Sequence, residues 1–248
     1  MSNFLVFVFI FYIGSTLGWI FELFYRRIEH KKWVNPGFLV GPYLPIYGFG
    51  LVTLTFLHFF LSNYRLSAIV IIILTGLILT LIELVAGLIF IKGGKVKLWD
   101  YSDRWLNYKG IICPQFSLIW TILGAIYYYF LADKMVVAIS WFSENLSFSF
   151  ILGIFFGAIL IDFVYSTRVL VKVRKFAKEN KILVRYEELK GHIQDIQKDL
   201  HEKYSFVFPF KQTRSLKEYL NNYKENNSRW FLWKRFWNMN FYSCLVAL

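Results

Sequence analysis

Five stretches of the chain are apolar enough to enter a lipid bilayer, and short polar segments separate them. Residues 3–25 carry a single charge, Glu22, and residues 67–91 carry a single charge, Glu83. A helix needs about 20 residues to cross the hydrocarbon core, so each of these runs is long enough. The other three runs are residues 43–62, residues 111–132, and residues 148–165 with Asp162. The pattern predicts an all-α polytopic membrane protein with five transmembrane helices.

Composition and charge place this helical protein in a membrane with a defined orientation. Hydrophobic residues make up 57% of the chain and charged residues only 18%, unlike a soluble domain. The four loops hold four, one, five and one Lys or Arg in chain order, and 17 follow Tyr165. Because basic loops stay in the cytoplasm, we expect an outside N-terminus, a cytoplasmic C-terminus and a multi-pass location in the plasma membrane. The first apolar run is too long for a signal peptide, so we expect it to be retained.

The start of the second helix is ambiguous. Residues 36–50 contain three of the five prolines and four of the fifteen glycines, which an ordinary helix does not tolerate. Either the helix begins late, near Ile46, and still has 17 residues to Ser62, or the segment is irregular and is buried against protein or lines a cavity. Residues 135–142 are too few to span and are predicted to lie in the outer interface.

One pattern of residues occurs twice along the chain. The first copy consists of Glu22, Trp33, Asn35, Gly37 and Pro42, and the second of Glu83, Trp105, Asn107, Gly110 and Pro114. In both copies the acid lies in an apolar run and the Trp-x-Asn segment follows it. The first four helices are therefore predicted to form two parallel helical-hairpin repeats, related by a pseudo-two-fold axis along the membrane normal. Such a repeat suggests an intramembrane site shared by two halves.

The acids in the apolar runs are the strongest candidates for function. An ionised carboxylate at the bilayer centre costs about 2.5–3.5 kcal/mol on insertion scales. Glu22 has Arg26 one turn away, whereas Glu83 has no basic residue within two turns, so Glu83 is favoured. The predicted intramembrane polar site or pathway consists of Glu22, Glu83, Asp162, Asn35 and Asn107. The alternative is tight helix packing with paired or protonated acids, because small residues accompany them in Gly76, Thr80 and Gly87, and in Gly153 and Gly157.

The predicted cytoplasmic loops carry the remaining polar residues, and none forms a recognisable catalytic set. Asp100 and Asp103 are too few to hold a metal and suit a solvated turn. Asn35 and Asn107 alternatively cap helix starts, and the loop tryptophans suit the headgroup belt. Residues 93–95, Gly-Gly-Lys, lack the preceding glycine and the following Ser or Thr of a phosphate-binding loop. We therefore expect no enzyme activity, no catalytic residue, no cofactor and no metal.

The character of the chain changes after Tyr165. Residues 166–248 contain 17 basic and 8 acidic residues, a composition that favours anionic lipid on the cytoplasmic leaflet over nucleic acid. A heptad seam either pairs with a partner helix or folds back on its own chain; it consists of Ile182, Tyr186, Leu189, Ile193, Ile196 and Leu200. The aromatic stretch from Trp230 to Tyr242 is predicted to be an interfacial anchor. The predicted domains are a five-helix transmembrane domain, 1–165, and a basic cytoplasmic helical tail, 166–248.

The motifs in residues 5–165 resemble a known bacterial family. They are Gly18-Trp19-x-x-Glu22, the run from Trp33 to Gly50, Glu83-Leu, Leu98-Trp-Asp-Tyr-Ser-Asp103, and Asn107-x-x-Gly110-x-Ile-Cys113. Together they resemble the CmpB-like, type IV ABC-transporter permeases, an integral-membrane family. One departure is Pro36, where many members have a basic or small polar residue.

The resemblance implies a permease component that works with a separate ATPase subunit, since the chain has no nucleotide loop of its own. The cytoplasmic loops would supply the coupling surface through Trp33, Gly37, Trp99, Asp100, Asp103 and Gly110. Five helices enclose a pathway poorly, so a homodimer in the lipid bilayer is expected. The alternative from another class is a membrane scaffold or regulator that binds anionic lipid or a partner protein through its basic tail.

Overall fold

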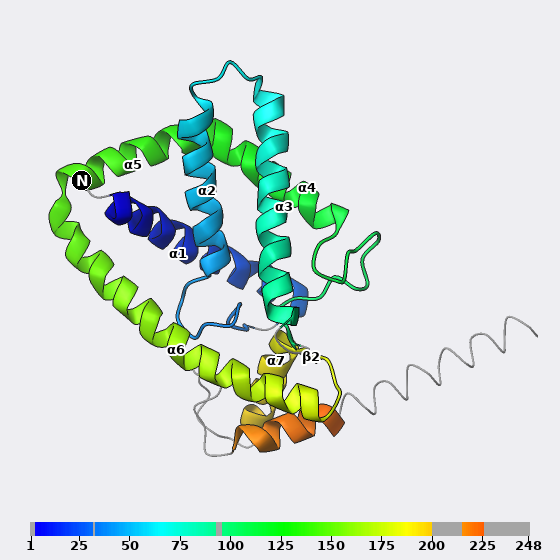
Figure 1. The fold of residues 1–248 in the computed structure, drawn as a ribbon. Coiled ribbons are helices and arrows are strands. Elements are labelled where there is room, and N and C mark those ends of the chain that lie inside the picture. The colour runs from blue at the N-terminus through cyan, green and yellow to red at the C-terminus, as the bar shows by residue number, and fades with distance from the viewer. Residues whose placement is uncertain (1–2, 32, 93–95, 200–214, 226–248) are drawn as a thin grey trace, which may run out of the picture.

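The computed structural model describes residues 3–31, 33–92, 96–199 and 215–225, and helices dominate it (Figure 1). The helices of the apolar part are α1 (Asn3–His30), α2 (Pro45–Leu61), α3 (Ala68–Lys92), α4 (Pro114–Ile126), the π-helical turn η1 (Tyr127–Leu131), α5 (Ala132–Glu144), the 3-10 turn η2 (Leu146–Phe148) and α6 (Ser149–Glu179). The tail adds α7 (Tyr186–Asp199) and a helix at residues 216–225. Two short strands, β1 (Val96–Lys97) and β2 (Val184–Arg185), form a parallel pair that the all-α prediction did not include.

Four helical segments of the described residues are long and apolar enough to cross a membrane. They are Asn3–Ile28, Ala68–Ile91, Pro114–Glu144 and Leu146–Glu179, and α2 is a fifth, shorter apolar helix. The protein is therefore a mostly helical membrane protein, whereas the fifth span stays a prediction. Helix α2 begins at Pro45, which agrees with the late start expected near Ile46.

The third of these spans is longer than predicted. Residues 135–142 are part of α5, which continues from α4 through η1. No glycine or proline lies between Ala125 and Glu144, so nothing in the local sequence stops the helix at residue 132.

Glycines bring the helices of each hairpin into close contact. A Cβ atom on Gly48 of α2 would lie 2.2 Å from Ser15 Oγ of α1, and one on Gly76 of α3 would lie 2.1 Å from Thr121 Oγ1 of α4. The predicted small-residue stripe of α3 therefore faces α4. In contrast, a Cβ on Gly153 or Gly157 of α6 would meet nothing within 4 Å, so the tight packing expected for that pair is absent from the described structure.

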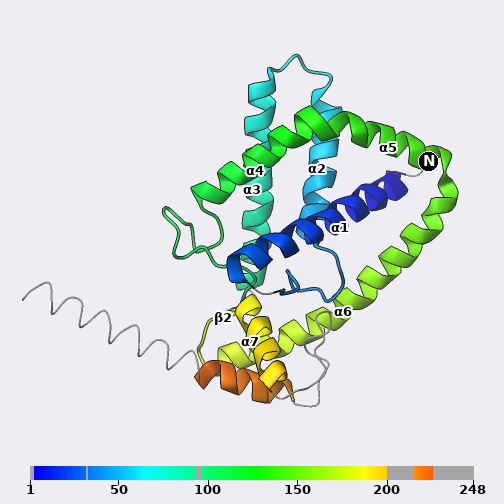
Figure 2. The same cartoon turned by 180° about the vertical axis from the view of Figure 1, so that it is seen from behind.

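Three of the connections between the apolar helices lie at two opposite ends of α2 and α3. The turn between α2 and α3 lies at one end, and the described residues of the loops 31–44 and 93–113 lie at the other, next to α7 (Figures 1 and 2). We call these loop one and loop two. Parallel pairing of Val96 with Val184 ties loop two to the start of the tail. The two loops predicted to be most basic thus share one end with the tail.

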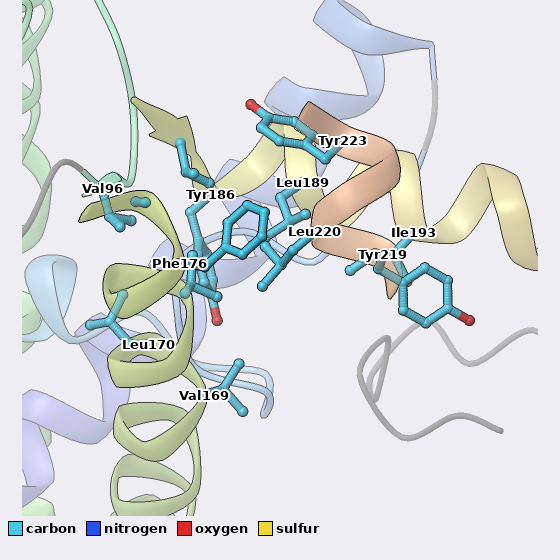
Figure 3. Close-up of a cluster of buried hydrophobic side chains, with 13 residues drawn as sticks. Val96, Val169, Leu170, Phe176, Tyr186, Leu189, Ile193, Tyr219, Leu220 and Tyr223 are labelled. Atoms are coloured by element: carbon cyan, nitrogen blue, oxygen red, sulfur yellow. The ribbon is translucent and has the colours of Figure 1, made fainter. Parts of the chain in front are cut away.

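The described part of the tail packs against itself and against the end of α6. The predicted boundary at residue 165 falls inside α6, which continues without interruption to Glu179. A hydrophobic cluster joins α6, α7 and the helix at 216–225 (Figure 3); it includes Val173, Phe176, Tyr186, Leu189, Ile193, Leu220 and Tyr223. Of the predicted heptad seam, Tyr186, Leu189 and Ile193 are therefore covered by their own chain. The side chains of Ile196 and Leu200, and the aromatic stretch 230–242, lie outside the described residues.

Candidate functional site

Glu22 accepts two hydrogen bonds near the end of α1 that leads into loop one. Arg26 Nη2 donates to Glu22 Oε1 over 2.7 Å, one helical turn away. The Tyr47 hydroxyl of α2 donates to Glu22 Oε2, also over 2.7 Å. Tyr47 fits closely against α1 because Gly18 leaves space for its ring; a Cβ at that position would lie 2.3 Å from it. The pairing of Glu22 with Arg26 agrees with the paired-acid alternative for this residue.

Glu83 is 2% exposed and is held by neutral donors. The Tyr101 hydroxyl of loop two donates to Oε1 over 3.0 Å, and Trp120 Nε1 of α4 donates to Oε2 over 2.8 Å. Tyr101 is stacked on Phe116, with 4.2 Å between ring centroids and 10° between planes. Within the described residues no Lys or Arg forms an ion pair with Glu83. Glu22 is thus paired with Arg26, as predicted, whereas Glu83 has no ion-pair partner among the described residues, either nearby in the sequence or in the tertiary structure.

The surroundings of the two acids meet between the hairpins. The ring centroids of Tyr47 and Trp120, which hold one acid each, are 5.7 Å apart. Burial raises the pKa of Tyr101, and the charges of Glu83 and Glu22 raise it further, so Tyr101 stays a neutral donor. We call Glu22, Tyr47, Glu83, Tyr101 and Trp120 the acid site. It gathers two carboxylates and three neutral donors, and Arg26 adds one positive charge at its edge.

Asn35 stabilises loop one and does not cap a helix. Its Oδ1 accepts from Trp19 Nε1 of α1 over 2.7 Å, and its Nδ2 donates to the Val40 carbonyl over 2.7 Å. The residue before α2 is Leu44, which has no side-chain cap, so the capping interpretation is wrong for Asn35. Gly37 has a φ of +72°, a conformation that favours glycine. Asn35 thus joins loop one to α1 one turn before Glu22.

Asp162 of α6 anchors the other side of loop one. Its carboxylate accepts from the backbone N–H of Val40 and of Gly41, the latter over 2.7 Å, and from the Tyr43 hydroxyl over 2.9 Å. Ser166 Oγ donates to it from the next turn of α6 over 2.8 Å. The structure therefore gives Asp162 partners in loop one and α6, apart from the hydrogen bonds of Glu22 and Glu83.

The polar residues of loop two form a compact turn. Asn107 donates to the carbonyls of Ser102 and Arg104 and accepts from the Gly110 N–H over 2.9 Å. It does not cap α4, because the residue before that helix is Cys113. Gly110 has a φ of +67°, and Trp99 Nε1 donates to the Ile111 carbonyl over 2.9 Å. These contacts fix the segment that presents Tyr101 to Glu83.

The two acids of loop two differ in their surroundings. Asp100 contacts Lys97 Nζ over 2.7 Å and Arg185 Nε over 2.8 Å. Its burial favours the neutral acid, but hydrogen bonds from Lys97 and Ser102 and the charge of Lys97 outweigh this and lower the pKa of Asp100. Asp103 is exposed, as expected for a solvated turn.

Trp33 of loop one, which was predicted to belong to the coupling surface, is 44% exposed.

Sequence reasoning found both acids but missed the side chains that hold them. Tyr47 and Trp120 lie shortly after the prolines that begin α2 and α4, and Tyr101 lies inside the Trp99–Asp103 motif. The usable signal for Tyr47 and Trp120 was their position: an aromatic donor follows soon after the proline that begins each helix.

A family model described as "Putative ABC-transporter type IV" matches residues 9–167. The chain belongs to this family. The matched range includes the complete acid site, loop one, loop two and Asp162. It ends inside α6, which leaves β2, α7 and the helix at 216–225 outside. The chain matches no curated protein and no solved structure.

Proposed function

We propose that this ABC-transporter-related membrane protein is the permease component of a transporter and works with a separate ATPase subunit. Membership in the family and the apolar spans support a membrane transport role. A separate subunit is needed because the only Gly-Gly-Lys sequence, at residues 93–95, lacks the other residues of a phosphate-binding loop.

The observation that carries the proposal is the meeting of two acids from two hairpins in one partly buried site. Carboxylates within apolar spans are costly and often line substrate or ion pathways. If both acids are ionised, the site carries a net negative charge, because the two carboxylates outweigh the single positive charge of Arg26. We propose that the substrate passes the acid site, with Glu83 as the central residue and Glu22, Asp162, Asn35 and Asn107 shaping the pathway around it.

The proposed orientation has the N-terminus outside and loop one, loop two and the tail in the cytoplasm. Loops one and two hold most of the basic residues outside the tail, and contacts with the tail bring them to the same end. We include α2 as the fifth span, with α1–α2 and α3–α4 as parallel repeats in the plasma membrane. Because five helices enclose a pathway poorly, the working unit would be a homodimer.

Exposed aromatic side chains on the two loops favour these loops as the surface that receives the ATPase. Trp33 is 44% exposed and Trp105 is 78% exposed, and tryptophan is enriched at protein interfaces. The scaffold alternative gains no comparable support, because the described part of the heptad seam is covered by α6 and the helix at 216–225.

The test replaces each acid by its neutral isostere in the native host at normal expression. We expect Glu83→Gln to abolish rescue of the deletion phenotype and Glu22→Gln to weaken it. The exposed Glu144→Gln serves as the matched control and should rescue fully. Full rescue by both acid variants would refute the role of the acid site, and native purification without any ATPase subunit would refute the ABC-type partnership.

A further inference from the structure

The start of the tail contacts both loops that lead to the acid site. Residues 184–190, which we call the clamp segment, comprise β2 and the first turns of α7. Three charged side chains of this segment contact loop two, α1 and loop one: Arg185, Glu187 and Lys190 respectively. The clamp segment lies beyond the residues 9–167 that match the family model.

Glu187 shares Arg26 with Glu22. One terminal nitrogen of the Arg26 guanidinium donates to Glu187, and the other donates to Glu22. The Arg26 side chain is 10% exposed and that of Glu187 is 18% exposed. The planar guanidinium presents its donors in a rigid fork, so a shift of the Glu187 carboxylate also moves the Arg26 nitrogen that donates to Glu22. The hydrogen bond from Arg26 to Glu22 therefore depends on the position of α7.

Lys190, one turn further along α7, fastens loop one. The residue is 2% exposed, and its ammonium group donates to the Gly37 carbonyl over 2.6 Å and to the Asn35 carbonyl over 3.2 Å. The Tyr186 ring lies 5.3 Å from the same nitrogen. Burial and the positive charge of Arg26 lower the pKa of Lys190 to about 7, partly opposed by the negative charge of Asp162.

Arg185 makes the corresponding contact with loop two. Its Nε donates to Asp100 over 2.8 Å, next to the pairing of β2 with β1. Asp100 directly precedes Tyr101, which donates to Glu83. One short segment of the tail is thus connected to both acids, to Glu22 through Arg26 and to Glu83 through Asp100 and Tyr101.

We infer that residues 184–190 clamp the two loops and position the donors of the acid site, with Glu187 acting through Arg26 on Glu22 and Arg185 acting through Asp100 and Tyr101 on Glu83. Lys190 holds the turn of loop one in place between them. The consequence for transport rests on the proposed function, whereas the clamp itself can be measured without any transport.

Cys113, which is buried and ends loop two, is a natural probe of the loop-two contact. In the full chain, Cys244→Ser leaves Cys113 as the single cysteine. Cys113 is then labelled with a water-soluble maleimide in membranes whose cytoplasmic side is exposed to the reagent. Loss of a charged hydrogen bond should raise the labelling rate about tenfold in Arg185→Gln. Arg185→Lys should restore slow labelling, and Glu179→Gln, an exposed change at the end of α6, should have no effect.

The loop-one contact needs an introduced probe. Val34→Cys, at a buried position beside Asn35, is labelled in a chain with Cys113→Ser and Cys244→Ser. Glu187→Gln and Lys190→Met should each speed this labelling about tenfold, and Glu187→Asp should restore slow labelling.

The effect of each variant on the two probes distinguishes positioning of one loop from general stabilisation of the protein. Arg185→Gln should affect the loop-two probe, and Glu187→Gln and Lys190→Met the loop-one probe. Equal acceleration of both probes by every variant, or no acceleration by any of them, would overturn the clamp. These rates do not depend on the substrate, so a failed clamp is distinguishable from a failed transport proposal, which Glu83→Gln tests separately.

Discussion

Replacement of Glu83 by glutamine or by leucine separates the charge of this residue from its hydrogen bonds. Both variants remove the same carboxylate and keep a similar volume, so the difference between them reports the contacts with Tyr101 and Trp120. In Glu83→Gln the amide oxygen can accept from Trp120 Nε1, and the amide nitrogen can donate to the Tyr101 hydroxyl, which is able to accept. In Glu83→Leu both donors lose their partner.

The size of the difference follows from the two orphaned donors. An unsatisfied buried donor costs about 1–3 kcal/mol. Tyr101 and Trp120 are only partly buried, so the lower part of that range applies, about 2–3 kcal/mol for the pair. At roughly 2–4 °C per kcal/mol for a chain of this length, Glu83→Leu should melt about 4–12 °C below Glu83→Gln.

The assay is the temperature at which the detergent-solubilised protein loses its monodisperse peak. The control is the same pair of substitutions at Glu144, which is exposed and should give no difference between Gln and Leu. Equal melting temperatures for Glu83→Gln and Glu83→Leu would refute the hydrogen-bonded acid site.

Three further predictions concern helix packing, loop one and pH. Gly48→Ala should cost about 1–3 kcal/mol by overpacking and lower the melting temperature, whereas Gly153→Ala, with open space around it, should not. Asp162→Ala should speed hydrogen exchange at the two loop-one amides that it holds by about tenfold or more, with a smaller effect from Ser166→Ala. The docked Lys190 has a pKa of about 7, below its value in a released tail, so docking of α7 should strengthen as pH rises above about 7, by at most ~1.4 kcal/mol per unit. As pH rises, labelling of the loop-one probe should therefore slow relative to labelling in the Lys190→Met variant at the same pH. A ratio of the two rates that does not change with pH would refute the lowered pKa of Lys190.

Local patterns were sufficient to predict the helices and the acids within them. The spacing of Gly76, Thr80 and Gly87 indicated the face of α3 that meets α4, because residues three and four apart share one helix face. The proline-rich stretch predicted either a late start for α2 or an irregular buried segment, since proline cannot donate within a helix, and the structure shows both features. The end of the apolar helix expected at residue 132 was wrong, because a helix without glycine or proline has no local signal for where it ends, and this one continues to Glu144.

The partners of the polar residues were not readable in the same way. Asn35 and Asn107 looked like helix caps, since capping needs only a side-chain oxygen, yet both stabilise loops. Asp162 was predicted as a further acid of the pathway, and its partners include backbone amides 121 and 122 positions earlier in the chain. Such contacts depend on which segments lie together, and sequence spacing carries no information about that.

The sequence by itself determined which apolar segments are helical and which helix faces carry small residues. It also determined that Glu22 and Glu83 lie in apolar surroundings, where an unsatisfied carboxylate is costly. Only the tertiary structure decided which donors satisfy them: Tyr47 lies 25 positions from Glu22, and Trp120 lies 37 positions from Glu83. It also placed the clamp segment of the tail over both loops. The physical reason is that hydrophobic periodicity encodes a helix and its buried face locally, whereas the partner of a buried polar group is set by long-range packing of separate elements.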